Sequence, residues 1–355
     1  MAILLVLLQH FGPQEMWIHQ VGWTGVDLFF VLSGFLVSGL LFREMDRFGD
    51  VEPKRFLIRR GYKIYPTFWI MITATIVLRL CYREHMTWQA IACELVFLQN
   101  YGQSLWSPTW SLAVEEHFYL LLALGFYWYG KRQPRLSERQ GFLLAGAFLL
   151  LILAVRTATV LTVHSGARWV TWGTHVRLDS LAFGAILAYV YHRHRAGLQR
   201  FVRRHWMWML PLGIVMVCHV FVFDMGTVFT RTIGYTLLYL GYSSIMLTTL
   251  FMLPATDAVS RFLATIGRSS YGIYIWHMPF FTLVVDKLVG WHVLPKPLTR
   301  TLPFYLVVCI GAGIVLTRLI EAPFLAKRDE RWPNRKAVAP APVPMEAAER
   351  ERAAV

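Results

Sequence analysis

The sequence predicts an all-α membrane protein with about ten transmembrane helices around a polar cavity. Hydrophobic residues make up 56% of the 355 residues, and charged residues make up 16%, well below the quarter that is usual in a soluble domain. The hydrophobic residues form runs near the length of a membrane-spanning helix, and the basic residues gather in loops between these runs. The net charge of +14 therefore does not indicate nucleic-acid binding, which would need a basic soluble face.

Ten apolar runs are expected to cross the bilayer. In chain order they cover residues 1–11, 24–42, 62–81, 110–129, 141–163, 177–191, 207–223, 232–253, 269–289 and 301–320. The first run is short and ends where Gly12 and Pro13 stop a helix. Residues 88–101 are too short and broken to cross, so an interfacial or re-entrant segment is predicted there.

The basic residues alternate from loop to loop, which orients the chain. The loop at 43–63 holds seven of them, and the next loop holds few. By the positive-inside rule we expect a multi-pass protein of the inner (plasma) membrane with both termini in the cytoplasm. His10 and Asp27 then lie near the outer face, and Lys63 lies at the inner face.

One membrane domain is predicted over residues 1–326. Residues 327–355 are basic and rich in alanine and proline, so a disordered cytoplasmic tail is predicted for them. The four cysteines show no paired spacing, so neither a disulfide framework nor a metal site is predicted.

Asp27 is the one ionisable residue in the second run, and it is the first candidate site residue. A carboxylate inside lipid is costly, so it needs a partner or a polar cavity. A hairpin of the first two runs would bring His10 to the same depth, where the carboxylate could orient the imidazole as a general base. The alternatives are an aspartate that caps its helix and an interfacial histidine. Ser33 and Gly34 are small enough to let another helix approach closely.

A basic cluster precedes the third run. Arg59 and Lys63 are one helical turn apart, with Arg60 beside them, and like charges so placed repel each other. A phosphate group or a lipid headgroup would relieve this repulsion. The alternative is that these residues only anchor the loop at the inner face.

Further charged residues begin the fourth and sixth runs on the outer side. Glu115 and Tyr119 are four apart and share a helical face, although a helix dipole alone can favour an acidic residue there. Arg177 and Asp179 are two apart and cannot face each other, so each should pair elsewhere. All these charged residues, with His10 and Asp27, could line one outer cavity.

The ninth run places His277 near the middle of the membrane, with Tyr274 three residues before it on the same side. His277 could be a second catalytic group, a donor to a substrate or a structural hydrogen-bond partner, and the structural interpretation is favoured.

These motifs together resemble the acyltransferase-3 family of integral-membrane O-acyltransferases. The individual motifs are weak, but they occur in consistent order over residues 1–326. They are His10, GVDLFFVLSGF at 25–35, RRGYKIYP at 59–66, WSLAVEEHFY at 110–119, Arg177 with Asp179 and Gly184, SYGIYIWH at 270–277, and EAPF at 321–324.

The resemblance implies a ten-span bacterial enzyme that moves an acyl group, often acetyl, from acyl-CoA to a carbohydrate or other hydroxyl acceptor. His10 aligns with the family histidine, and Arg59 and Lys63 align with its basic motif. Two departures stand out. The family usually has an arginine eleven residues before the histidine, and this sequence begins too late to contain it. We expect either a translation start upstream of Met1 or a shortened member of the family. The basic motif usually ends in arginine and here ends in Lys63.

The sequence thus predicts an enzyme, an O-acetyltransferase-like acyltransferase, with acyl-CoA as co-substrate, no other cofactor, and a carbohydrate or lipid-linked glycan as acceptor. Arg59, Arg60 and Lys63 would hold the CoA phosphates. The roles expected of the other residues are catalysis by His10, Asp27 and Glu115, and an acceptor-side or structural network of Arg177, Asp179, Tyr274 and His277. The alternative is a transporter for a polar or acidic solute, since intramembrane charges also mark transport pathways; no inverted repeat favours it.

Overall fold

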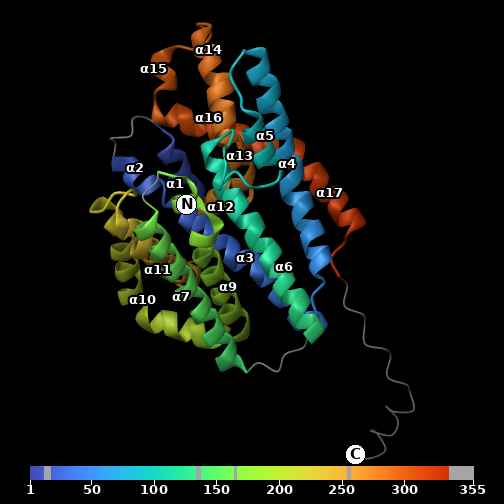
Figure 1. The fold of residues 1–355 in the computed structure, drawn as a ribbon, viewed down its shortest axis with the longest axis vertical. Coiled ribbons are helices and arrows are strands. Elements are labelled where there is room, and N and C mark those ends of the chain that lie inside the picture. The colour runs from blue at the N-terminus through green and yellow to red at the C-terminus, as the bar shows by residue number, and fades with distance from the viewer. Residues whose placement is uncertain (12–16, 133–136, 164–165, 254–256, 336–355) are drawn as a thin grey trace, which may run out of the picture.

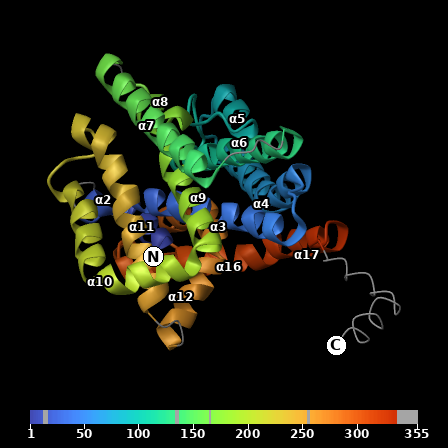
Figure 2. The same cartoon turned by 90° about the horizontal axis from the view of Figure 1, so that it is seen from below.

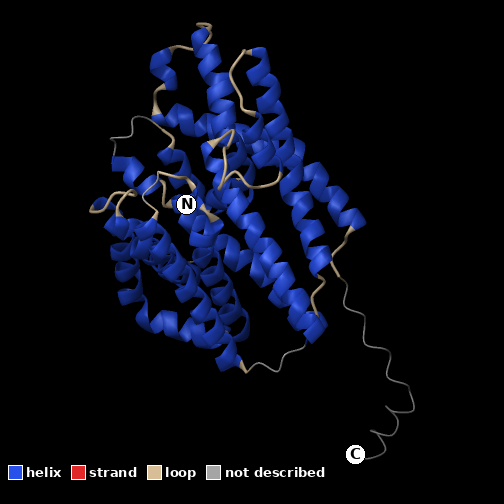
Figure 3. Ribbon diagram, viewed as in Figure 1, coloured by secondary structure: helices blue, strands red, loops and turns tan. Residues whose placement is uncertain are grey.

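The computed structural model describes residues 1–11, 17–132, 137–163, 166–253 and 257–335. Within these ranges every regular element is helical, as Figure 3 shows, so the predicted all-α class is confirmed. The α-helices are α1 (Ala2–Gln9), α2 (Trp17–Gly22), α3 (Gly25–Phe48), α4 (Pro53–Cys81), α5 (Trp88–Leu95), α6 (Trp110–Arg132), α7 (Glu138–Thr162), α8 (Trp169–Trp172), α9 (Leu178–Arg193), α10 (Arg195–Cys218), α11 (Tyr235–Met252), α12 (Ala258–Arg268), α13 (Ser270–Phe280), α14 (Asp286–Gly290), α15 (Lys296–Thr299), α16 (Leu302–Leu316) and α17 (Ala322–Arg331).

Short tighter or wider helical turns join or extend these helices. They are η1 (Ser107–Thr109), η2 (Thr174–Val176), η3 (His219–Phe221), η4 (Thr230–Gly234), η5 (Phe281–Val285) and η6 (Thr317–Glu321).

Several helices are apolar enough to indicate a multi-pass membrane protein. Five described helical segments have the length and composition to span a bilayer: His19–Phe48, Pro53–Cys81, Glu138–Thr162, Thr230–Met252 and Leu302–Arg331. Each of the ten predicted runs contains a helix, but the count of ten spans stays a prediction. The first helix, α1, has eight residues and is too short to cross unaided.

Helix α3 occupies the centre of the molecule. It contacts α1, α6, α9 and α11. Figure 1 shows α7, α9, α10 and α11 on one side of it and α4 and α6 on the other, and in the view of Figure 2 α3 lies between α6 and α16. Residues on α3 can therefore reach both halves of the bundle.

Glycines permit the closest helix crossing, between α3 and α9. A β-carbon added at Gly34 would clash with the backbone oxygen of Leu181, and one added at Gly184 would clash with the backbone oxygen of Val31. The prediction that a helix packs closely on Gly34 is confirmed. Because both backbones are in contact, the spacing of these two helices is fixed.

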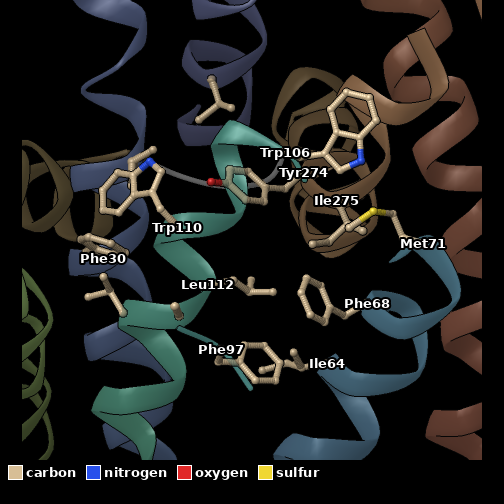
Figure 4. Packing of buried hydrophobic residues seen from close by; sticks show 14 of the residues in the cluster. Phe30, Ile64, Phe68, Met71, Phe97, Trp106, Trp110, Leu112, Tyr274 and Ile275 are labelled. Carbon is tan, nitrogen blue, oxygen red and sulfur yellow. The ribbon is translucent and has the colours of Figure 1, made fainter. Parts of the chain in front are cut away.

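An aromatic-rich core fills the space between α3, α4, α6 and α13 (Figure 4). The rings of Phe30 and Trp110 pack edge to face, with centroids 5.8 Å apart. Phe68 stacks on Phe97 at 5.0 Å. This core holds the inner faces of the helices that carry the polar residues described below.

The C-terminal helix extends further than predicted. Helix α17 continues to Arg331, so residues 327–331 are helical rather than part of a disordered tail. This end of the chain contacts the rest of the protein: Asp329 in the helix bonds Arg59 at 3.0 Å, and Arg335 beyond it bonds Asp50 at 2.8 Å. Residues 336–355 lie outside the described residues.

Because α3 and α9 cross so closely, alanine substitutions at two glycines should change the free energy of unfolding in opposite directions. Gly34→Ala should lower the free energy of unfolding by about 1–3 kcal/mol, because the added methyl group overpacks a backbone contact. Gly146→Ala in α7, where a β-carbon would meet nothing within 4 Å, should raise it by about 0.5–1 kcal/mol. Thermal unfolding in detergent measures both. Equal shifts in the same direction would contradict the close crossing.

Candidate active site

His10 follows the last turn of α1, and one of its ring nitrogens is already committed. Nδ1 lies 2.9 Å from the carbonyl oxygen of Val6. A carbonyl can only accept, so Nδ1 carries the proton and the neutral ring keeps its lone pair on Nε2. A histidine in this tautomer can act as a base through Nε2.

His277 lies directly beside His10. The two ring centroids are 5.0 Å apart, and the His277 Nδ1 donates to the carbonyl oxygen of Tyr274 at 2.7 Å. Its Nε2 is buried and has no hydrogen-bond partner among the described residues. Helices α1 and α13, far apart in sequence, thus bring two histidines together.

The expected pairing of Asp27 with His10 is not formed. Asp27 is completely buried and accepts a hydrogen bond from Nη2 of Arg177 at 2.8 Å. A guanidinium neutralises a buried carboxylate, whereas a neutral imidazole cannot, so Arg177 is the better partner. Arg177 also lies over aromatic rings, 3.8 Å from the centroid of Tyr235 and 5.4 Å from that of Trp110.

Asp179 has a different partner, as its spacing from Arg177 predicted. Nη1 of Arg156 lies 2.6 Å from its carboxylate, and Nη2 of Arg156 donates to Thr236 at 2.7 Å. Arg156 was not singled out from the sequence. A lone arginine in the middle of the apolar run at 141–163 was the signal that could have identified it.

A cavity of about 110 Å³ opens between these groups. Its wall includes His10 and Gln9 from α1, Trp110 from α6, Arg177, Tyr235 from α11 and Tyr274 from α13. Of the charged residues expected to share one cavity, His10 and Arg177 line it, with Asp27 behind Arg177. No cluster of three or more metal-binding side chains occurs in the part of the chain that the structure describes.

Hydrogen bonds of the wall residue Tyr274 and of Glu94 hold the loop at residues 105–109 in place. The hydroxyl of Tyr274 donates to the carbonyl of Pro108 at 2.7 Å and pairs with Ser111 at 2.6 Å, so its bonds are structural. Glu94 accepts from the amide of Leu105 at 2.9 Å and from Thr109 at 2.8 Å. Burial raises the pKa of Glu94 to about 7.

Glu115 belongs to a second polar cluster outside this cavity. Tyr119 donates to Glu115 at 2.8 Å, as the shared helical face predicted, and bonds Ser33 at 2.6 Å. Arg60 donates to the same Tyr119 hydroxyl at 2.8 Å. Asp27 and Ser33 are six residues apart on α3, so this cluster lies about 9 Å further along that helix.

The basic residues at the start of α4 have partners within the chain. Lys63 bonds Glu321, and Arg59 bonds Asp329 and the carbonyl of Trp332. The repulsion between Arg59 and Lys63 is thus relieved by carboxylates of η6 and α17. It does not by itself indicate a bound phosphate, contrary to the sequence argument.

Comparison with known proteins gives consistent matches. A family model described as an acyltransferase domain matches residues 1–318. The peptidoglycan O-acetyltransferase OatA of Listeria monocytogenes is 26% identical over 304 residues, covering 75% of this chain and 46% of the relative. The putative peptidoglycan O-acetyltransferase YrhL of Bacillus subtilis is 26% identical over 330 residues, covering 83% and 50%.

A putative O-acetyltransferase of Staphylococcus aureus is 25% identical over 360 residues, covering 91% of this chain and 55% of the relative. The chain therefore spans about half the length of the curated relatives it matches. No solved structure matches it.

A buried and an exposed ion pair should differ in how much stability is lost when the carboxylate is replaced by an amide. Asp27→Asn leaves the buried Arg177 without a counter-charge and should lower the free energy of unfolding by about 3–5 kcal/mol. Asp329→Asn breaks a pair whose aspartate is 53% exposed and should cost less than about 1 kcal/mol. Unfolding of both variants in detergent tests this. An equal loss would mean that Asp27 is not held by a buried ion pair.

Proposed function

The chain belongs to the acyltransferase-3 family, and on this premise we propose that it is a membrane O-acetyltransferase that uses acyl-CoA. The observation that carries the proposal is His10, with its Nε2 free to accept a proton, on the wall of a cavity that it shares with Arg177. A base and a cation on one small cavity are what acyl transfer to a hydroxyl group requires.

The reaction moves the acyl group from the sulfur atom of acyl-CoA to the oxygen atom of the acceptor hydroxyl. The acceptor hydroxyl oxygen attacks the thioester carbonyl carbon while His10 Nε2 takes the hydroxyl proton. The tetrahedral intermediate collapses, the carbon–sulfur bond breaks, and the imidazolium returns the proton to the CoA thiolate. The products are an O-acetyl ester and free CoA, and His10 is again neutral.

The donor is proposed to bind at Arg59, Arg60 and Lys63. CoA phosphates would replace Asp329 as the partner of Arg59 and Glu321 as the partner of Lys63, so that phosphate oxygens take the place of carboxylate oxygens. Glu115 positions Arg60 through the hydroxyl of Tyr119, which donates to Glu115 and accepts from Arg60. We place this end of α4 at the cytoplasmic face of the plasma membrane, with both termini on the same side.

The acceptor is proposed to be a carbohydrate or a lipid-linked glycan that reaches the cavity from the outer face. Two relatives carry peptidoglycan in their names, which supports a cell-wall glycan as acceptor. Asp27 serves the site by holding Arg177, and Asp179 serves the fold by holding Arg156.

Replacement of the base tests the reaction. His10→Ala should lower acetyl transfer from radiolabelled acetyl-CoA by about 10²–10⁴-fold, the usual contribution of a general base. His85→Ala, an exposed histidine after α4, is the matched control and should transfer normally. The assay uses purified protein in detergent, where no gradient can drive transport. Near-normal transfer by His10→Ala, with loss in His277→Ala, would move the role of base to His277.

Loss of charge tests the donor site. Lys63→Gln should raise the KM for acetyl-CoA about tenfold or more, as expected for one charge-assisted hydrogen bond. Lys63→Arg should keep the affinity, since a guanidinium also binds phosphate. Lys54 is an exposed residue at the start of the same helix, so Lys54→Gln is the control for loss of one positive charge. If Lys63→Gln and Lys54→Gln have the same KM as the unchanged protein, Lys63 serves only the ion pair with Glu321.

A further inference from the structure

Arg177 has hydrogen-bond donors that the fold does not use. Its side chain is 3% exposed, and only Nη2 is bonded, to Asp27. Nε and Nη1 are buried and have no partner among the described residues. Buried donors without partners are costly and rare, so they call for a functional explanation.

The surroundings of Arg177 fix the direction of these donors. The ring of Tyr235 lies against the guanidinium at 3.8 Å, and the ring of Trp110 lies at 5.4 Å. Asp27 holds Nη2 on one edge of the guanidinium plane. The same three residues, Arg177, Tyr235 and Trp110, line the cavity together with His10. The guanidinium is therefore oriented before any substrate arrives.

We propose that Arg177 binds the carbonyl oxygen of the acyl group and stabilises the oxyanion that forms on it. This inference rests on the proposed function, since it assigns a role within the same acyl transfer. When the acceptor hydroxyl attacks, the carbonyl π electrons move to oxygen, and Nη1–H of Arg177 donates to that oxyanion. When the carbon–sulfur bond breaks, the electrons return to form the ester carbonyl.

The ion pair with Asp27 makes Arg177 suitable for this role. An arginine stays protonated, so its donors are always available. Asp27 neutralises the charge of the resting site. The free donor of Arg177 bonds the carbonyl oxygen and bonds it more strongly as negative charge develops there, which is how a fixed donor accelerates a reaction.

Arg156 provides a matched comparison within the same fold. It is also fully buried and also pairs with an aspartate, Asp179, but it does not line the cavity. Its two Nη groups are engaged with Asp179, Val176 and Thr236, and its Nε, like that of Arg177, has no partner among the described residues. The free Nη1 is therefore what distinguishes Arg177 from Arg156. Any effect of losing a buried arginine on the fold alone should therefore appear at Arg156 as well.

Lysine substitutions separate a role of the arginine in the reaction from a role in the fold. Arg177→Lys keeps a positive charge for Asp27 but removes the second terminal nitrogen, Nη1, which a guanidinium holds in a fixed plane. Its kcat with acetyl-CoA and a soluble peptidoglycan fragment as acceptor should fall about 10²–10³-fold, the usual loss for one oxyanion donor, with KM for acetyl-CoA changed only slightly. Arg156→Lys should keep kcat within about threefold at matched folded protein. Turnover by the unchanged protein establishes the proposed function separately, so equal kcat in both lysine variants overturns only the role of Arg177.

A spectroscopic measurement tests the contact directly and does not depend on turnover. In the His10→Ala protein, the carbonyl carbon of acetyl-CoA labelled with ¹³C should show a downfield NMR shift relative to free acetyl-CoA, because its oxygen accepts hydrogen bonds. Adding Arg177→Lys should return the shift toward the free value, and adding Arg156→Lys should leave it displaced. A shift that is the same in all three proteins would overturn the inference.

Discussion

The buried ion pair between Asp27 and Arg177 is the interaction on which the candidate site depends. It joins α3 to the start of α9, the same two helices that cross at Gly34 and Gly184. A charge on either partner alone would be very costly at this depth. Together with the rings of Tyr235 and Trp110, the pair holds a cation against a cavity whose wall also carries His10.

The sequence was sufficient to predict that Asp27 and Arg177 need partners, but it led to the wrong partner for Asp27. Depth in the membrane follows from loop charges, whereas the direction in which a side chain points around its helix does not. Asp27 and Gly34 are seven residues apart, two helical turns, so they share a face. Because α9 packs on Gly34, α9 was the helix from which the partner of Asp27 had to come.

Other features depended on contacts between distant segments. The helical class and the small residues of α3 followed from composition and spacing. The partners of Arg59 and Lys63 could not be predicted in this way, because the carboxylates that bond them lie 270 and 258 residues further along the chain. The extension of α17 was not predicted because the polar composition of residues 327–331 resembles that of a tail, and the contact of Asp329 with Arg59 joins segments far apart in the chain. Arg156 was overlooked because the apolar run around it was interpreted only as a span.

The contact between α4 and the C-terminal helices also has a consequence for biosynthesis. Glu321 is made 258 residues after Lys63. At roughly 5–20 residues per second, the ribosome needs about 13–50 s to cover that stretch. For all that time the basic start of α4 carries charge without its internal partners. The charge is free when the helix enters the membrane, where it can orient the segment, and it is neutralised only when the last helices are released and dock. The same residues thus serve first as an insertion signal and later as tertiary anchors.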